Sequence, residues 1–173
     1  GNNGWPFASA AKVTNEAGAD FAWADFKIRA AGDIKLTALT SSMYCSATSN
    51  LRGKVYVKVG DGEFVEKGEA AADAKHMQFN KQDITTSVKA GEEVTVRVAI
   101  ATLETKTVDK TVSGVIGNVV IYYDIEGTPV AFPGADGNYN IIDYYTGDGT
   151  QWTAIEDGTS ADGMVSWESI AYH

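Results

Sequence analysis

Apolar and polar residues alternate with a period of two along much of the first 126 residues. In residues 22–29, one set of alternate positions is small or apolar and the other is mostly charged: Ala22, Ala24, Phe26 and Ile28 against Trp23, Asp25, Lys27 and Arg29. Because successive side chains of a strand point to opposite faces, this pattern predicts a half-buried β-strand. The same alternation predicts strands over residues 34–39, 55–59, 94–101 and 119–125.

Turn-forming residues separate the predicted strands. Gly60-Asp61-Gly62 precedes Phe64 and Val65 and predicts a β-hairpin, since Asp-Gly tolerates the positive φ of tight turns. Residues 76–80 and 83–88 predict two further strands, the second leading into a turn at 89–93. Residues 68–75 contain four alanines, which favour a helix, and we expect one or two helical turns there.

Many short strands with glycine-rich turns, and no alternation of strands with helices, predict an all-β fold: an antiparallel β-sandwich, jelly-roll-like. We expect one domain over residues 1–173, with the main sandwich in 20–126. Residues 128–173 hold short apolar pieces between Gly/Asp turns. Because this segment is too short to form a hydrophobic core of its own, we expect it to be a loop-rich C-terminal extension that packs on the sandwich.

Composition narrows the range of partners. The chain has 14 Lys and Arg against 23 Asp and Glu, a net charge of −9, which argues against nucleic acid because phosphate binding needs a cationic surface. Its apolar runs are too short for membrane insertion, so we expect a soluble domain. Cys45 is the single cysteine, so neither an intramolecular disulfide nor a cysteine zinc cluster is available.

Two segments resemble the late strands of jelly-roll carbohydrate-binding modules in secreted bacterial glycan-degrading or surface proteins. Residues 83–98 contain a Lys-Ala-Gly-Glu-Glu turn at 89–93 followed by a valine-rich strand, and residues 117–125 resemble the closing strand of those modules. The resemblance covers residues 20–126 as a pattern of strand spacing. It implies a bacterial, exported protein (secreted or at the cell surface) whose partner is a polysaccharide or another glycan.

Aromatic residues supply the candidate carbohydrate-binding positions. Trp23 falls on the polar side of its predicted strand, and Tyr122 shares a face with Asp124 rather than with the apolar residues of its own strand. An open aromatic ring can stack on the apolar face of a pyranose while polar neighbours bind the hydroxyls. The candidate set is Trp23, Tyr122, Asp124, Tyr144, Tyr145, Trp152 and Trp167. The competing interpretation makes Trp23 and Tyr122 a second core layer beneath the C-terminal extension.

Oxygen-bearing residues in the extension predict a structural calcium ion. Asp136, Asn138 and Asn140 stand at alternate positions, as in the start of an EF-hand-type loop, and Asp143 follows. Ile141 occupies the position where such a loop has glycine. The competing interpretation is that Asp, Asn and Gly are present here because they form turns. No other cofactor is expected.

Three functional classes remain open. The first is a non-catalytic carbohydrate-binding accessory module of an exported bacterial protein. The second is a structural or adhesive cell-surface sandwich without a sugar site. The third is a small polysaccharide lyase or hydrolase, which requires a close pair of carboxylates in a cleft. This class is the least favoured of the three, since the chain lacks a nucleophile elbow and a phosphate-binding loop.

Overall fold

The computed structural model describes residues 5–7, 13–15, 20–45, 51–72, 75–102, 106–108, 114–126, 132–133, 139–140, 142–146, 159–161 and 163–167. Side chains are described for 20, 23–44, 51–71, 75–100, 116–126 and 163–164. Every regular element in these ranges is a β-strand. None of the described residues belongs to a helix that could cross a membrane.

The strands follow one another along the whole chain. In chain order they are β1 (Trp5–Phe7), β2 (Val13–Asn15), β3 (Asp20–Ala30), β4 (Ile34–Cys45), β5 (Leu51–Val59), β6 (Val65–Ala72), β7 (His76–Val88), β8 (Glu93–Thr102), β9 (Lys106–Val108), β10 (Gly114–Ile125), β11 (Phe132–Pro133), β12 (Tyr139–Asn140), β13 (Ile142–Thr146), β14 (Thr159–Ala161) and β15 (Met164–Trp167).

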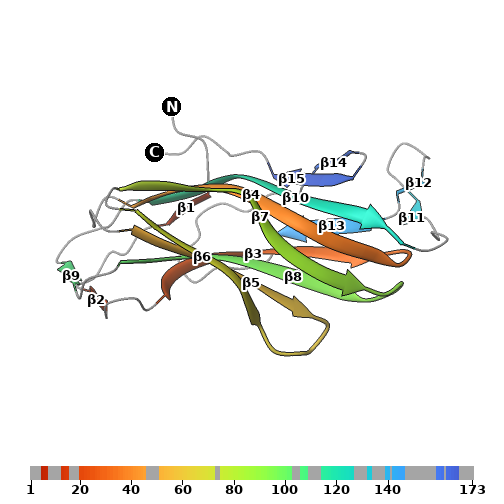
Figure 1. Ribbon diagram of the computed structural model, residues 1–173, viewed down its shortest axis with the longest axis horizontal. Coiled ribbons are helices and arrows are strands. Elements are labelled where there is room, and N and C mark those ends of the chain that lie inside the picture. Colours follow the sequence, from red (N-terminus) through yellow and green to blue (C-terminus); the bar gives the residue numbers. More distant parts are fainter. Residues whose placement is uncertain are drawn as a thin grey trace.

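Two antiparallel sheets pack face to face, so the predicted β-sandwich is confirmed (Figure 1). One sheet has the order β14-β15-β10-β4-β7, with β1 also pairing with β10; the other has the order β13-β3-β8-β5-β6. The chain passes between the two sheets at β3–β4, β4–β5, β6–β7 and β7–β8, while β5 and β6 form a hairpin within one sheet. The jelly-roll connection stays a prediction.

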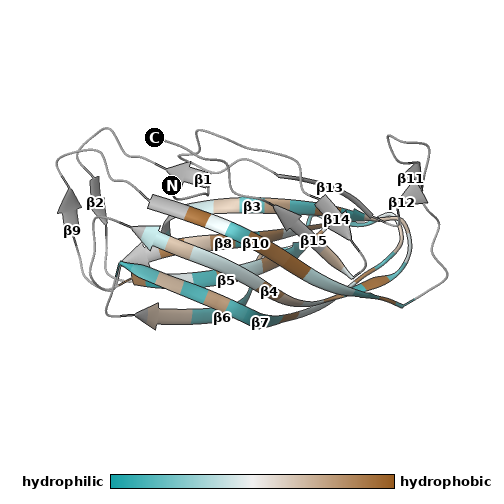
Figure 2. Ribbon diagram, turned by 90° about the horizontal axis from the view of Figure 1, so that it is seen from above, coloured by the Kyte–Doolittle hydropathy of each residue, from teal (hydrophilic) through white to brown (hydrophobic). Residues whose placement is uncertain are grey.

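The predicted alternation places the core between the sheets. On β3, Phe26 and Ile28 are fully buried while Lys27 between them is partly exposed and Arg29 is exposed. Figure 2 shows the corresponding change from hydrophobic to hydrophilic residues along the strands. Both sheets contribute to one cluster, whose largest fully buried members are Phe26, Ile28, Ile34, Leu36, Leu39, Leu51, Ile84, Ile100 and Ile116. Removing these side chains from water is the main stabilising contribution.

The helix predicted near residues 68–75 is wrong. Residues up to Ala72 form β6, which pairs antiparallel with β5 from Val57↔Val65 to Leu51↔Ala72. A helix of one or two turns has few internal hydrogen bonds and is marginal in water. The ladder with β5 provides those bonds along the whole segment, so tertiary pairing overrides the helix propensity of the alanines.

The predicted turns occupy the positions that need positive φ. Gly60 has φ +55° in the β5–β6 hairpin, and Gly91 has φ +85° between β7 and β8. The two strands predicted at 76–80 and 83–88 are one continuous strand, β7, in which Lys81 has φ +50° beside a register shift. The irregularity therefore interrupts the period-two pattern without ending the strand.

Parts of the C-terminal segment pair with both sheets. β13 adds to the edge of β3, and β15 pairs with β10. These pairings extend each sheet by strands from residues beyond 128. The prediction that residues 1–173 form one domain is compatible with them and stays a prediction.

Candidate functional site

The outer face of β3, β8 and β5 carries a group of aromatic and ionic side chains. Register pairs set these residues side by side in rows across the three strands: Trp23–Ala99–Lys54, then Asp25–Arg97–Tyr56, then Lys27–Thr95–Lys58. All of these positions alternate with core residues of the same strands, so they point away from the core. Ala99 and Thr95 are nevertheless buried, because the longer side chains of this face cover them.

Arg97 is the centre of this group. Its guanidinium carbon lies 4.8 Å from the ring centroid of Trp23 and 4.0 Å from that of Phe64. Its Nε donates to Asp25 Oδ1 at 2.7 Å, and its terminal nitrogen donates to Asp25 Oδ2 at 2.9 Å. The planar guanidinium thus combines a two-point carboxylate contact with cation–π contact to two rings, which an ammonium group does not reproduce.

A second ionic group lies at the other end of the same face. Arg52 donates to Asp20 Oδ1 at 2.6 Å, and the Tyr56 hydroxyl donates to Asp20 Oδ2 at 2.6 Å. The Arg52 side chain is 3% exposed and that of Asp20 is 24% exposed, so the pair is largely withdrawn from water. Tyr56 also contacts Phe64 edge-on, with ring centroids 6.5 Å apart, and so links the two groups.

The environment of Tyr56 favours its neutral form. Burial, followed by the hydrogen bond and the negative charge of Asp20, raises the pKa of the Tyr56 hydroxyl from 10.0 to about 12. A phenolate at this position would face the Asp20 carboxylate. Tyr56 is therefore a hydrogen-bond donor on this face at neutral pH.

The structure places Tyr122 and Asp124 on the other outer face of the sandwich. Both belong to β10, in the sheet opposite Trp23, and alternate with the buried Ile121 and Tyr123, as the sequence predicts. The Lys81 ammonium lies 5.2 Å from the ring centroid of Tyr122. Trp23 and Tyr122 are thus separated by the whole core and do not belong to one groove.

The C-terminal candidates are placed by their backbone or lie outside the described residues. Tyr145 is the register partner of Lys27 and Tyr144 that of Ile28, so both belong to the sheet of Trp23. Trp167 pairs with Val119 in the sheet of Tyr122. Trp152 lies outside the described residues. Strand pairing therefore brings Trp23, Tyr144 and Tyr145 to one sheet.

The predicted calcium ligands are likewise placed only by their backbone or lie outside the described residues. Asp143 is the register partner of Arg29, and Asn140 pairs with Phe132. Asp136 and Asn138 lie outside the described residues. Within the side chains that the structure describes, no group of three or more His, Cys, Asp or Glu residues is suited to a metal ion. The calcium site stays a prediction.

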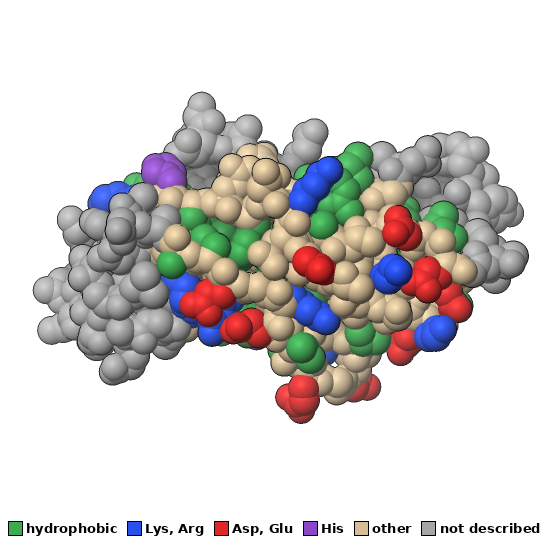
Figure 3. Space-filling view, in the orientation of Figure 1, with side chains coloured by type: hydrophobic (Ala, Val, Ile, Leu, Met, Phe, Trp, Pro, Cys, Tyr) green, Lys and Arg blue, Asp and Glu red, His purple; other side chains and the backbone are tan. Residues whose placement is uncertain are grey.

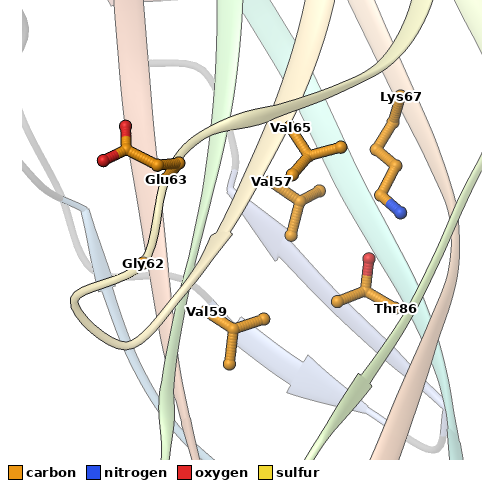
Figure 4. Close-up of a pocket in the computed structure, with 7 residues that line it drawn as sticks. All are labelled: Val57, Val59, Gly62, Glu63, Val65, Lys67 and Thr86. Atoms are coloured by element: carbon orange, nitrogen blue, oxygen red, sulfur yellow. The ribbon is translucent and has the colours of Figure 1, made fainter.

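A pocket of about 230 Å³ opens at the edge of the sandwich where the β5–β6 hairpin meets β7. It is lined by Val57, Val59, Gly62, Glu63, Val65, Lys67 and Thr86. Figure 4 shows the Glu63 carboxylate directed away from the three valines. Figure 3 shows acidic and basic side chains interspersed over the face drawn there. Ligand pockets combine an apolar lining with polar groups that converge on the ligand. Here the Lys67 ammonium donates to the carbonyl of Thr85 and the Glu63 carboxylate is directed away, so the outer face of β3, β8 and β5 is the better candidate.

Sequence analysis found Trp23 but missed the residues around it. Phe64 follows the hairpin turn and Arg97 is a polar position in the clearest strand, yet only the pairing of β3 with β8 and of β8 with β5 brings them to Trp23. Period-two patterning gives the face of each residue and not its neighbours across the sheet. One feature of the sequence could have indicated that Asp25 and Arg97 are neighbours: both occupy outward positions of their strands, and their charges are opposite in sign.

Comparison with known proteins identifies no family. No family model matches the chain, and no curated protein matches it. Among solved structures, it is similar to a chain in the crystal structure of the T13 IBDV viral particle, with 8% sequence identity and a TM-score of 0.30. The similarity covers 95% of this chain and 38% of that chain, so the present chain spans well under half of that protein's length.

Proposed function

We propose that this chain is a non-catalytic carbohydrate-binding module of an exported bacterial protein, and that it binds polysaccharide on the outer face of β3, β8 and β5. One observation carries the proposal. Trp23 and Phe64 are held against Arg97 on a sheet face whose other side chains are mostly polar. Outward aromatic rings beside fixed polar groups are the combination that a pyranose needs, because a sugar has an apolar face and a rim of hydroxyls.

The polar groups of this face suit hydroxyl recognition. Asp25 and Asp20 supply acceptor oxygens, and Tyr56 and Arg97 supply donors whose orientation is fixed by their own contacts. A side chain that is already ordered loses little conformational entropy when a ligand binds. The face is therefore organised before any ligand arrives.

A jelly-roll connection is part of the same proposal. The strand orders β1-β10-β4-β7 and β3-β8-β5-β6, with most consecutive strands changing sheet, support it. Jelly rolls include lectin domains as well as viral capsid domains. A fold of this kind hosts many functions, so glycan binding is inferred from the side chains rather than from the strand order.

A second candidate is a structural or adhesive cell-surface sandwich without a sugar site. The observation that favours it is that the polar groups of this face already bind one another. Asp25 is bound by Arg97, and Asp20 is bound by Arg52 and Tyr56. Polar groups that satisfy one another stabilise the sheet without any ligand.

Affinity electrophoresis in gels containing plant and host polysaccharides tests the proposal. We expect at least one polysaccharide to retard the protein, and Trp23→Ala to abolish the retardation. Tyr122→Ala is the matched control, since it removes a half-buried aromatic ring from the opposite face. If no polysaccharide retards the protein, the structural candidate is favoured. If only Tyr122→Ala loses binding, the binding site lies on the sheet that contains β10 instead.

A further inference from the structure

The candidate face carries no net charge when the flanking strands β6 and β13 are included. Among the described strands, the register places six cationic residues on the outer face of this sheet: Lys27, Arg29, Arg52, Lys54, Lys58 and Arg97. Six acidic residues belong to the same face: Asp20, Asp25, Glu66, Glu69, Glu93 and Asp143. The whole chain has a net charge of −9, so its negative excess lies elsewhere on the protein.

Charges of opposite sign are neighbours across the strands of this face. Two aspartates are each bound by an arginine. The Lys54 ammonium lies 2.8 Å from Glu66 and 3.9 Å from Glu69, both on β6. The register sets Arg29 between two acidic residues, one on each neighbouring strand. The face is therefore balanced locally as well as in total.

A charged ligand has to compete with these internal partners. An anionic group that binds Arg97 competes with Asp25, which holds the guanidinium by hydrogen bonds of 2.7 and 2.9 Å. A cationic group that binds Asp20 competes with Arg52, whose side chain is 3% exposed. Separating such a pair leaves a shielded charge without its partner, which is costly. The face therefore disfavours ionised groups of either sign.

A hydroxyl group can bind here without separating any pair. An ionised carboxylate has about four acceptor sites, and the 24% exposed Asp20 is bound by two donors, Arg52 and Tyr56. The rings of Trp23 and Phe64 lie beside these polar groups. Apolar ring surface and spare acceptor sites are thus available together.

We infer that the outer face of β3, β8 and β5 selects a neutral polysaccharide, built from pyranoses without ionised groups, and excludes uronate polymers. The inference rests on the proposed function and specifies its ligand class. Sugar rings contact Trp23 and Phe64, and their hydroxyls donate to the carboxylates that the arginines hold in place. A polyanion that extends beyond this face meets the negative charge of the rest of the protein.

Affinity electrophoresis with matched neutral and oxidised polymers tests the ligand class. The panel contains neutral glucans, mannans and galactans together with polygalacturonate. The neutral polymer that binds best is then oxidised at its primary hydroxyls to the uronate, which keeps the rings and adds the charge. We expect at least one neutral polymer to retard the protein, and its oxidised form to bind about tenfold more weakly. Raising the salt concentration should change binding of the neutral polymer less than about twofold, because no ionised ligand group is screened.

A double variant that unbalances the face tests the cause of the selectivity. Glu66→Gln with Glu69→Gln removes both carboxylates beside Lys54. At low salt this variant should bind the oxidised polymer about tenfold more tightly than the unmodified protein does, and high salt should abolish the gain.

Asp124→Asn with Glu126→Gln is the matched control. It changes the net charge of the protein equally, but both residues are exposed at the end of β10 in the opposite sheet. Binding of the oxidised polymer should stay as weak as in the unmodified protein. Thermal unfolding of each variant verifies that the sandwich is intact.

The outcomes separate the inference from the proposed function. Equal binding of the neutral and oxidised polymers, or retardation by polygalacturonate alone, would overturn the neutral ligand class and leave the carbohydrate-binding proposal standing. An equal gain in both double variants, or no gain in Glu66→Gln with Glu69→Gln, would overturn the role of the balanced charges. If no polymer of the panel retards the protein, both the inference and the proposed function are overturned.

Discussion

Arg97 and Asp25 face each other across β8 and β3 and are joined by two parallel hydrogen bonds, of 2.7 and 2.9 Å. The side chains are 26% and 12% exposed, so the pair is partly shielded from water. The same guanidinium contacts Trp23 and Phe64. Arg97 therefore joins one ion pair of the candidate face to two of its aromatic rings.

Arg97→Lys should destabilise the protein by about 1–2 kcal/mol, because lysine keeps the charge but loses the two-point contact and the planar stacking. Urea unfolding of the two proteins measures the difference. Lys35→Gln is the control: its ion pair with Glu126 is 3.8 Å long between side chains about two-fifths exposed. Such a pair contributes about 0.5 kcal/mol or less. Equal effects of the two variants would refute a special role for Arg97.

The raised pKa of Tyr56 predicts that the protein loses stability at alkaline pH. Its folded-state pKa is about 12 against an ordinary value of 10.0, so the folded state keeps the hydroxyl proton when the unfolded chain releases it. The resulting stabilisation is complete below pH 10 and is lost as the pH rises through 10 toward 12. Tyr56→Phe removes the ionisable group, so its unfolding free energy should fall less steeply over this window.

Denaturant unfolding at a series of alkaline pH values compares the two slopes. At neutral pH, Tyr56→Phe should be less stable by about 1–2 kcal/mol, since the hydrogen bond to the Asp20 carboxylate is lost. Ultraviolet titration provides a second measurement, in which the variant should lack the tyrosine that ionises near pH 12. Identical alkaline slopes would show that Asp20 does not hold the Tyr56 proton.

Most of the fold follows from the period-two pattern. The pattern gave the strands containing Phe26, Val96 and Ile121 and the direction of their side chains, because burial of one face is a local property of each strand. The prediction failed at residues 68–72, where composition favours a helix. There the segment forms strand β6 because it pairs with β5. Local propensity is a weak guide wherever long-range pairing supplies the hydrogen bonds.

The candidate site was less accessible to sequence analysis. Trp23 and Tyr122 both have outward positions, yet they belong to different sheets, and the alternation is identical in either case. Phe64, Arg97 and Asp25 come from three separate segments. Sheet order and register determine which outward residues become neighbours. Both are set by long-range pairing, so the pattern within a single strand does not reveal them.

Gly68 provides a test of the contact between the two sheets at the edge of the sandwich. A Cβ atom on Gly68 would overlap the side chain of Gln82 on β7, with Cγ at 2.8 Å. Gln82 Nε2 donates to the carbonyl of Lys67 on β6 at 3.3 Å, and Lys67 Nζ donates to the carbonyl of Thr85 at 3.0 Å. These side chains join the two edge strands, and a Cβ on Gly68 would displace the Gln82 side chain from its present position.

Gly68→Ala should therefore destabilise the protein by about 1 kcal/mol, because Gln82 must move and its hydrogen bond to Lys67 is lost. In a Gln82→Ala background the same change should be neutral or stabilising by about 0.4–1 kcal/mol, since alanine restricts the unfolded chain more than glycine does and the space is then free. A double-mutant cycle by urea unfolding measures the coupling between the two positions. Additive effects would mean that Gln82 does not occupy the space above Gly68.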